Sequence, residues 1–486
     1  MMRTLFLQAP SFDGFDGGAG ARYQMRREIQ SFWFPTWLAQ PAALVADSKL
    51  IDAPPHRLKF EDVVPEAMRR DLVVMHTSTP SFSVDVRTAE GLKALKPSLK
   101  IGLIGAKVAV EPEASLKAST AIDFVARNEF DFTIKEVAEG RDFARIAGLS
   151  WRNADGVVAH NEDRAVLENM DDLPFVTPIY KRDLVIENYF SGYLKHPYIS
   201  FYTGRGCKSR CTFCLWPQTI GGHRYRTRSV GHVIEELAWA QKAFPQVKEF
   251  FFDDDTLTDN LPRVEAIARE IGKLGMVWSC NAKANVPRST LKVLKDNGLR
   301  LLLVGYESGN QKILHNIKKG MRVDVAKRFA KDCRELGIVT HGTFILGLPG
   351  ETKETIEETI RFAIEVNPHT IQISLAAPYP GTELYDQAKL NGWFVKKDKT
   401  DLVEDDGFQQ SSLEFPGLSK DEIFESVERF YHRYYLRPKP ILRIIKTMLE
   451  DKDVCVRRLR EGYEFFKSMA QRRTDLAASK AHSASA

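Results

Sequence analysis

In the segment Cys207-Lys208-Ser209-Arg210-Cys211-Thr212-Phe213-Cys214, three cysteines stand close together. The segment follows an apolar run at 198–203, a predicted strand, and two glycines that favour a tight loop. Thiolates this close together bind a soft metal centre in a reducing compartment. The next cysteine along the chain, Cys280, has no cysteine neighbour. The pattern therefore predicts a metal centre with three protein ligands and one open position.

A structural zinc site is the first alternative for these cysteines. Zinc sites of that kind take four protein ligands, so His223 or another histidine would have to supply the fourth. An iron–sulfur cluster needs no fourth protein ligand when one of its irons stays open. A chance grouping of cysteines is the other alternative, and the spacing favours the cluster.

The composition of the 486 residues is that of a globular protein with two or three domains. Apolar residues make up 43% and charged residues 27%, which is typical of such proteins. The balance of 69 basic and 64 acidic residues, or +5, is too mild to argue for nucleic acid. There is no disulfide pattern, no signal-peptide pattern and no run long enough to span a bilayer, so we expect a cytoplasmic protein.

Residues 1–150 alternate short apolar runs with helix-like stretches, which indicates a parallel sheet covered on both faces. Ligands of such sheets bind at the carboxyl ends of the strands, where His76-Thr77-Ser78 and Gly105 are expected. Residues 151–194 follow as a hairpin, turning at Asp155-Gly156, and an interdomain connector. The strands predicted in the first domain are 4–7, 49–52, 71–76, 99–105 and 121–126.

Residues 195–400 hold six apolar runs separated by helical stretches, which predicts six β/α units in an open partial barrel. Active sites of barrels gather at the carboxyl ends of the strands, and the cysteine segment follows the first run, as that rule requires. Later runs end in Asp253-Asp254-Asp255, in Asn281 and Lys283, and in Glu307. The predicted strands are 198–203, 247–252, 276–280, 300–305, 339–346 and 370–376.

These polar strand ends have more than one chemical interpretation. The three aspartates could bind a hard metal ion, and a carboxylate there also complements an ammonium group. Lys283 suits a carboxylate partner, or it is a solvated loop lysine. Glu307 suits a ribose or amino group, or it forms a structural ion pair.

The spacing C-x3-C-x2-C, with Phe213 before the last cysteine, resembles the radical S-adenosylmethionine (radical SAM) superfamily. The resemblance implies that Cys207, Cys211 and Cys214 bind a [4Fe–4S] cluster and that SAM chelates the open iron. It also implies a 5′-deoxyadenosyl radical that abstracts hydrogen from a C–H bond, and a one-electron reductant such as flavodoxin or ferredoxin. The implied SAM contacts are Phe213, Asp253, Asp254, Asn281, Lys283 and Glu307.

The first domain resembles the cobalamin-binding, Rossmann-like domain that precedes many radical SAM domains. The resemblance implies cobalamin contacts at Thr77, Ser78 and Gly105. The D-x-H-x-x-G signature, whose histidine ligates cobalt in some cobalamin proteins, is absent, because Asp52 and His56 have neither its spacing nor its glycine. We therefore expect cobalamin to bind without a lower histidine ligand. The alternative is a retained scaffold that only shapes the substrate pocket.

Aromatic residues gather in the segment 10–41, beside arginines and a glycine-rich stretch. Trp33 and Trp37 could form a substrate lid at the strand ends, or they pack between domains. The stretches 8–18 and 32–41 resemble the hopanoid-biosynthesis-associated radical SAM proteins of bacteria. That resemblance implies a lipid-linked hopanoid substrate and contraction of an amino-sugar ring to the cyclitol ether of bacteriohopanetetrol.

Two rival functions stay open beside the hopanoid one. The first is a cobalamin-dependent radical SAM methyltransferase, in which the substrate radical takes a methyl group from methylcobalamin. The second is an iron–sulfur sensor or scaffold without catalysis. It predicts a cluster but no 5′-deoxyadenosine.

The last part of the chain is predicted to be helical over 401–475, with a disordered tail at 476–486. An apolar stripe runs along 441–449 at helical spacing, with Arg443 and Lys446 beside it. The stripe predicts packing against the barrel or contact with an anionic membrane surface at the inner face of the membrane, and packing is the commoner explanation.

Overall fold

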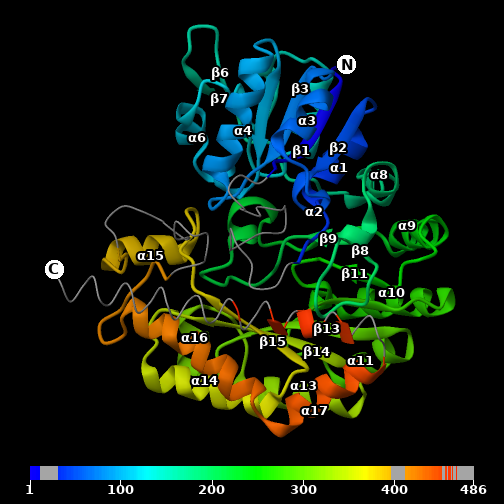
Figure 1. Ribbon diagram of the computed structural model, residues 1–486, viewed down its shortest axis with the longest axis vertical. Coiled ribbons are helices and arrows are strands. Elements are labelled where there is room, and N and C mark those ends of the chain that lie inside the picture. Colours follow the sequence, from blue (N-terminus) through cyan, green and yellow to red (C-terminus); the bar gives the residue numbers. More distant parts are fainter. Residues whose placement is uncertain are drawn as a thin grey trace.

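The computed structural model describes residues 1–10, 31–395 and 411–450, with scattered residues between 455 and 467. It is an α/β protein with two sheets built mainly of parallel strands. One sheet lies above the other in Figure 1, and helices follow near the C-terminus. The predicted fold class is confirmed: a Rossmann-like sheet, a partial barrel and a C-terminal helical extension. The glycine-rich part of the predicted lid and the predicted disordered tail lie outside the described residues.

The N-terminal sheet has the order β2-β1-β3-β4-β5-β6-β7, and its first five strands are parallel. These strands are almost entirely buried, because helices cover both faces of the sheet. The predicted hairpin is present as β6 and β7, and it extends this sheet. The domain division at residue 150 stays a prediction. The strands are β1 (Thr4–Gln8), β2 (Ser48–Asp52), β3 (Leu72–His76), β4 (Lys100–Ile104), β5 (Phe124–Ala126), β6 (Leu149–Arg152) and β7 (Val158–His160).

Helices of this domain connect one parallel strand to the next, as the alternating pattern predicts. Short loops connect the ends of β3 and β4 to α4 and α5. These loops lie at the carboxyl edge of the sheet, which faces the barrel. The helices are α1 (Thr36–Leu44), α2 (Ala53–His56), α3 (Phe60–Met68), α4 (Phe82–Leu95), α5 (Ala106–Val110), α6 (Pro112–Ala118), α7 (Asp131–Ala138) and α8 (Thr177–Asp183).

The second sheet has the order β15-β14-β13-β12-β11-β8, and every neighbouring pair is parallel. Its six strands match the six predicted runs. They are β8 (Tyr198–Phe201), β11 (Glu249–Phe252), β12 (Trp278–Ala282), β13 (Leu299–Glu307), β14 (Val339–Leu346) and β15 (Thr370–Leu375). The main helices are α9 (Val230–Ala243), α10 (Leu261–Leu274), α11 (Arg288–Asp296), α12 (Gln311–Asn316), α13 (Val323–Glu335), α14 (Lys353–Val366) and α15 (Glu383–Asn391).

A C-terminal helix covers the edge strand of the barrel. Helix α16 (Lys420–Tyr435) begins at a capping box, and α17 (Pro438–Glu450) follows it. The hydroxyl of Tyr431 accepts from the N–H of Ile373 at 2.9 Å, and that of Tyr435 from the N–H of Ile371 at 3.0 Å. These bonds occupy edge groups of β15 that would otherwise be open to another strand.

A short antiparallel ribbon, β9 (Gly204–Arg205) with β10 (Arg226–Thr227), frames the cysteine segment. Its two arginines are buried and reach the N-terminal domain. Arg205 donates to Asp131 at 2.5 and 3.1 Å, and Arg226 donates to Glu129 at 2.8 Å. Glu129 lies in the loop between β5 and α7, and Asp131 is the first residue of α7, so two buried ion pairs join the ribbon to the first domain.

The aromatic segment packs inside the protein. Phe34 stacks on Tyr189 with ring centroids 4.2 Å apart, and Trp33 meets Phe251 of β11 edge-on at 5.5 Å. Trp37 stacks on Trp216, just past the cysteine segment, at 5.1 Å. These contacts are those of the interdomain-packing alternative. The substrate-lid role of Trp33 and Trp37 stays a prediction.

We expect Asp131→Asn to lower the free energy of unfolding by about 3 kcal/mol, because it leaves a buried guanidinium without its close counter-charge. Urea unfolding followed by tryptophan fluorescence measures the change. The control is Asp296→Asn, which removes an exposed ion pair with Lys292 and should have little effect. Equal losses in the two variants would contradict a special role for the buried pair.

Candidate functional site

The cysteine segment is held by a close approach of backbone strands. Gly206 adopts φ +87°, and a Cβ there would overlap the carbonyl of Arg224 and lie 2.8 Å from that of Gly221. Only glycine tolerates both the left-handed conformation and this crossing. The N–H of Cys207 then donates to the carbonyl of Gly222 at 3.3 Å, so the loop starts from a fixed point.

One side-chain amide organises the rest of the loop. The NH2 group of Gln218 lies 3.2, 3.2 and 2.8 Å from the carbonyls of Cys211, Thr212 and Cys214. Its carbonyl oxygen accepts from the N–H of Glu383, at the start of α15, at 2.9 Å. Gln218 is not among the predicted site residues, because a glutamine after a motif carries no local signal of such a role.

None of the three cysteines forms a disulfide, and charged groups surround Cys211. Burial raises the pKa of Cys211, with smaller contributions from the charges of Lys319, Glu307, Cys207 and Lys283. Among the described residues, no three His, Cys, Asp or Glu side chains converge as ligands of a single metal ion would. A cluster does not require that convergence, since each cysteine binds a different iron.

A buried ion pair stands beside these thiols. Lys319 Nζ donates to Glu307 Oε1 at 2.7 Å. Burial alone would lower the pKa of Lys319, but the negative charges of Glu307, Cys211 and Cys214 raise it. Glu307 ends β13 at φ +61°, and a Cβ at Gly305 would overlap its carboxylate and stand 2.9 Å from Lys319 Nζ. Lys319 was not among the predicted site residues.

The predicted SAM carboxylates Asp253 and Asp254 differ in their surroundings. Asp254 accepts from Thr203 N at 2.6 Å, Thr203 Oγ1 at 2.7 Å and Tyr225 OH at 2.5 Å, and burial raises its pKa. Both carboxylate oxygens are thus engaged in holding the ribbon. Asn281 Nδ2 lies 2.9 Å from the carbonyl of Asp254 and 3.4 Å from Asp253 Oδ1.

Lys283 and Phe213 complete the predicted SAM set. Lys283 Nζ donates to Asp259 Oδ1 at 2.5 Å, and Asp259 Oδ2 lies 3.9 Å from Cys207 Sγ. This carboxylate therefore links the third barrel strand to the cysteine segment. Phe213 is half-buried and packs against the main core. His223, the alternative zinc ligand, bonds to the carbonyl of Ser209 through Nδ1 at 2.9 Å.

The carboxyl edge of the N-terminal sheet faces this loop. The N–H of Thr77 donates to the carbonyl of Ile104 at 2.9 Å, and Ser78 Oγ lies 2.9 Å from Ser81 Oγ. Gly105 adopts φ +122°, and a Cβ there would overlap the carbonyl of Thr77. The three residues predicted to contact cobalamin thus belong to two adjacent strand ends.

Two buried polar atoms at this edge lack hydrogen-bond partners. They are His76 Nε2 and Asp85 Oδ2. Burial lowers the pKa of His76 to about 4 and raises that of Asp85 to about 7. The imidazole is therefore neutral near pH 7. His56, by contrast, uses both ring nitrogens: Nδ1 with the carbonyl of Asp52 at 2.8 Å, and Nε2 with the N–H of Val185 at 3.0 Å.

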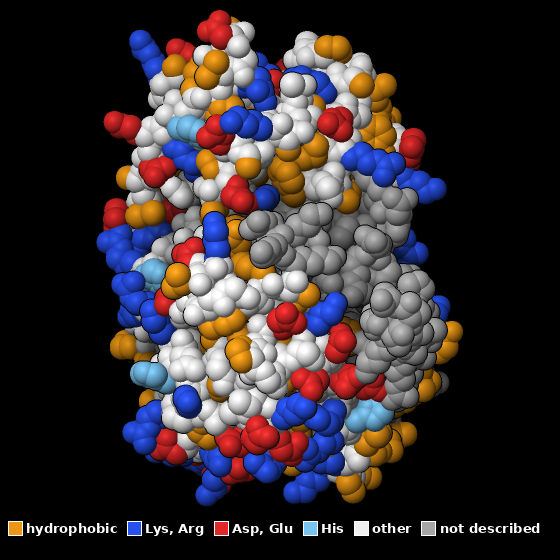
Figure 2. Space-filling view, turned by 90° about the vertical axis from the view of Figure 1, so that its left-hand side faces the viewer, with side chains coloured by type: hydrophobic (Ala, Val, Ile, Leu, Met, Phe, Trp, Pro, Cys, Tyr) orange, Lys and Arg blue, Asp and Glu red, His pale blue; other side chains and the backbone are white. Residues whose placement is uncertain are grey.

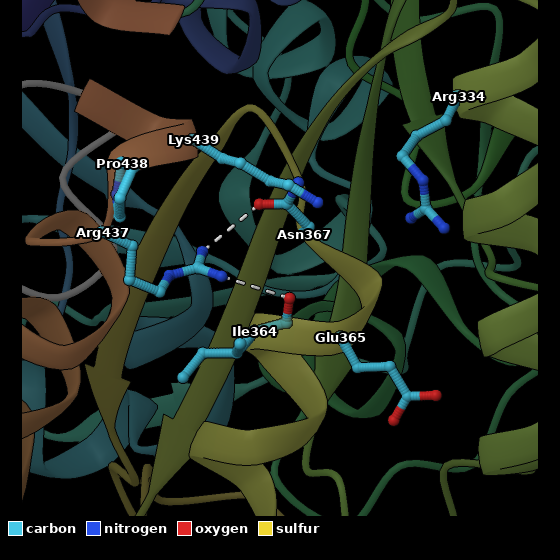
Figure 3. A pocket seen from close by; sticks show the side chains of 7 residues that line it. All are labelled: Arg334, Ile364, Glu365, Asn367, Arg437, Pro438 and Lys439. Carbon is cyan, nitrogen blue, oxygen red and sulfur yellow. Dashed lines mark hydrogen bonds between the residues drawn. The ribbon is translucent and has the colours of Figure 1, made fainter. Parts of the chain in front are cut away.

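A separate cleft of about 550 Å³ lies at the opposite end of the barrel (Figure 3). Arg437 crosses it, donating to the carbonyl of Ile364 at 3.3 Å and to Asn367 Oδ1 at 3.2 Å. Through these bonds, Arg437 caps the C-terminal end of α14. The cleft is therefore explained by the capping of that helix. It lies at the amino ends of the strands, away from the cysteines.

The fold and the site together define a class of radical enzyme: a partial barrel with a three-cysteine loop after its first strand, preceded by a Rossmann-like domain. Residues 201–363 match the family model described as the radical SAM superfamily. An uncharacterized methyltransferase of Pyrococcus horikoshii is 30% identical over 450 residues, which are 90% of this chain and 95% of that protein. The chain belongs to the radical SAM superfamily, and the predicted enzyme class, [4Fe–4S] cluster and SAM are thereby confirmed.

Other similar proteins cover most of the chain. The anaerobic magnesium-protoporphyrin IX monomethyl ester cyclase of Rubrivivax gelatinosus is 26% identical over 90% of this chain and 78% of that protein. The structure of the radical S-adenosylmethionine methyltransferase TsrM from Kitasatospora setae, with cobalamin and a [4Fe–4S] cluster bound, superposes with a TM-score of 0.68. It is 15% identical and covers 90% of each chain. This likeness confirms the order of sheet, half-barrel and helices.

Gly206→Ala should abolish most cluster loading, because a Cβ at this position meets two carbonyl oxygens. Iron and sulfide content after anaerobic reconstitution measures the loss. Gly222→Ala is the matched control: Gly222 also has positive φ, at +71°, but a Cβ there meets nothing within 4 Å. Both variants place a side chain at a positive φ, so equal iron contents would show that the close approach does not matter.

Proposed function

We propose that this protein is a cobalamin-dependent radical SAM methyltransferase acting on an unactivated carbon of a small molecule. The observation that carries the proposal is that the cysteine loop of the barrel and the carboxyl edge of the N-terminal sheet lie next to each other. The cysteine loop lies against the carboxyl edge of the N-terminal sheet, where Trp216 reaches within 6.5 Å of the His76 ring. The methyltransferase similar over nearly the whole chain supports the same function.

The cysteine set fits the cluster by its donor chemistry. Cys207, Cys211 and Cys214 are thiols outside any disulfide on one loop, while Cys280 lies inside β12. Burial raises the pKa of Cys211, and the positive charges of Lys319 and Lys283 partly offset that effect. When bound and reduced, the cluster supplies the electron that cleaves SAM.

The chain's own residues hold SAM and the loop in place. We assign Asp253 and Asn281 to the SAM ammonium, because the oxygens of Asp254 already hold Thr203 and Tyr225. Glu307 and Lys319 carry opposite charges beside the cysteines. Glu307 can accept hydrogen bonds from the ribose of SAM, and Lys319 can pair with the carboxylate of SAM. Gln218 fixes the carbonyls of the loop, so the thiols keep their positions during reduction.

The carboxyl edge of the first sheet fits a large polar cofactor. His76 Nε2 and Asp85 Oδ2 are buried there without hydrogen-bond partners, and glycine at position 105 lets the end of β4 pass close to the carbonyl of Thr77. A cobalamin there would contact Thr77, Ser78 and Gly105. Bound cobalamin would supply the methyl group, and the protein's part is to hold the target carbon between the two edges and exclude water.

The methyltransferase proposal ranks above hopanoid ring contraction, the first function that the sequence predicts. The comparisons with known proteins name methyltransferases and a cyclase, and the hopanoid role rests on the N-terminal stretches 8–18 and 32–41 alone. Residues 11–18 of the first stretch lie outside the described part of the chain. A lipid-linked hopanoid substrate stays a prediction.

A labelled methyl donor separates the two functions. Reconstituted enzyme with SAM deuterated on its methyl group, reductant and candidate substrates should give 5′-deoxyadenosine and a product heavier by the labelled methyl, measured by mass spectrometry. The variant with Cys207, Cys211 and Cys214 all replaced by alanine should lose iron and both products. Ring contraction without label would favour the hopanoid reaction, and a cluster without 5′-deoxyadenosine would favour the sensor.

We also propose that α17 docks on an anionic membrane surface. The exposed fractions of Leu442, Ile445 and Leu449 are 65%, 46% and 82%, so this face does not pack on the barrel. Lys439 and Lys446 are exposed on the same helix. On the face seen in Figure 2, acidic and basic side chains are interspersed. No described helix is long and apolar enough to cross a membrane.

Replacing Leu442 and Leu449 together by glutamate should reduce co-sedimentation with phosphatidylglycerol vesicles at least tenfold, since it removes apolar area and adds repulsion. Leu390→Glu is the control, because Leu390 is equally exposed on α15, at 87%. Binding by all variants alike, or binding to neutral vesicles with equal strength, would contradict the docking face.

A further inference from the structure

Two exposed cations stand inside the cysteine segment. Lys208 and Arg210 are exposed to solvent, whereas Cys207 and Cys211 on either side of them are buried. Consecutive Cα atoms are about 3.8 Å apart, so each cation is attached directly to one of the cysteines. A partner that touches the two cationic side chains from outside therefore lies next to two of the three thiols.

The positive charge of this segment is not neutralised locally. Within the described part of the chain, neither Lys208 nor Arg210 pairs with a carboxylate, and Lys208 Nζ donates to the backbone carbonyl of Asp259 at 3.5 Å. The less exposed cations behind the loop differ, because Lys283 and Lys319 each pair with a carboxylate. A solvated side chain explains one exposed lysine, but two cations within three residues of one loop make a local positive patch.

The backbone that carries this patch is fixed at both ends. Its start is bonded to the carbonyl of Gly222, and beyond its end the N–H of Thr212 donates to the carbonyl of Ile317 at 3.0 Å. The residue after Ile317, Lys318, is also exposed, but it pairs with Glu383 at 2.7 Å. The uncompensated charge beside the cysteines is therefore that of the cysteine segment itself.

We propose that Lys208 and Arg210 form the docking surface for an acidic electron-carrier protein that reduces the iron–sulfur cluster. The donor loses one electron and the cluster gains it, and no bond is made or broken. Opposite charges speed the encounter, and redox partners need only a small contact area. The inference depends on the cluster and goes beyond the methyl transfer proposed above. The net charge of +5 for the whole chain does not favour nucleic acid as the partner.

Rapid-mixing measurements of cluster reduction test this surface. Reconstituted full-length protein is mixed anaerobically with reduced flavodoxin, an acidic electron carrier, at low and at high ionic strength. The wild-type rate should fall as salt rises. Lys208→Glu with Arg210→Glu should slow reduction about tenfold at low ionic strength and remove most of the salt dependence. The matched control is Arg328→Glu with Lys331→Glu, which reverses two exposed cations of α13 and should react like the wild type.

Two further measurements separate docking from damage to the cluster. Photoreduction with 5-deazariboflavin, an uncharged donor, should give the same electron paramagnetic resonance signal of the reduced cluster in all variants. Affinity for immobilised flavodoxin should fall with the rate, and it can be measured even in a variant that loads no cluster. In that case Lys208→Gln with Arg210→Gln replaces the glutamate variant in the rate measurement.

A wild-type rate that does not depend on salt, or equal slowing by the control variant, overturns the docking surface. So does unchanged affinity for flavodoxin in the variant at Lys208 and Arg210. None of these outcomes affects the methyltransferase proposal, which fails instead if the product carries no labelled methyl group.

Discussion

Two buried ion pairs hold the cysteine segment against the N-terminal sheet, and the geometry of the site depends on them. Arg205 and Arg226 stand opposite each other in the short ribbon, where two like charges would repel. Asp131 and Glu129 of the other domain neutralise them. Desolvation consumes much of the Coulomb energy of such pairs, so their main effect is on position. They fix both ends of the loop that binds the cluster.

The same contact continues through stacked aromatic rings. Arg205 lies 5.0 Å above the ring of Trp37, which stacks on Trp216 at an angle of 13°. Trp216 follows the last cysteine closely and borders the His76 ring. A segment near the N-terminus thus forms part of the wall between cluster and sheet edge. This placement explains its density of aromatic residues in terms of packing.

Much of the fold could be predicted from the sequence, because parallel strands covered on both faces leave unbroken apolar runs. The cysteine spacing likewise identified the loop. The roles of Gln218 and Lys319 could not be predicted, since each depends on partners brought close only by the fold. Asp254 shows the reverse case: the sequence placed it at the right strand end, but folding directs its oxygens to Thr203 and Tyr225. Such a choice between neighbouring aspartates depends on side-chain direction.

The two histidines of the first domain show that motif spacing in the sequence and position in the fold can point to different functional residues. His56 attracted notice because Asp52 precedes it, yet its nitrogens serve a helix end and the connector. His76 matches no motif, but it ends a strand on the edge where ligands of parallel sheets bind. A glycine faces its free nitrogen, and the cysteine loop closes the other side. The atoms that the strand ends leave without hydrogen-bond partners determine what chemistry a sheet edge can do. The unpaired nitrogen of His76 is therefore a better indicator of a functional residue than the sequence spacing of His56.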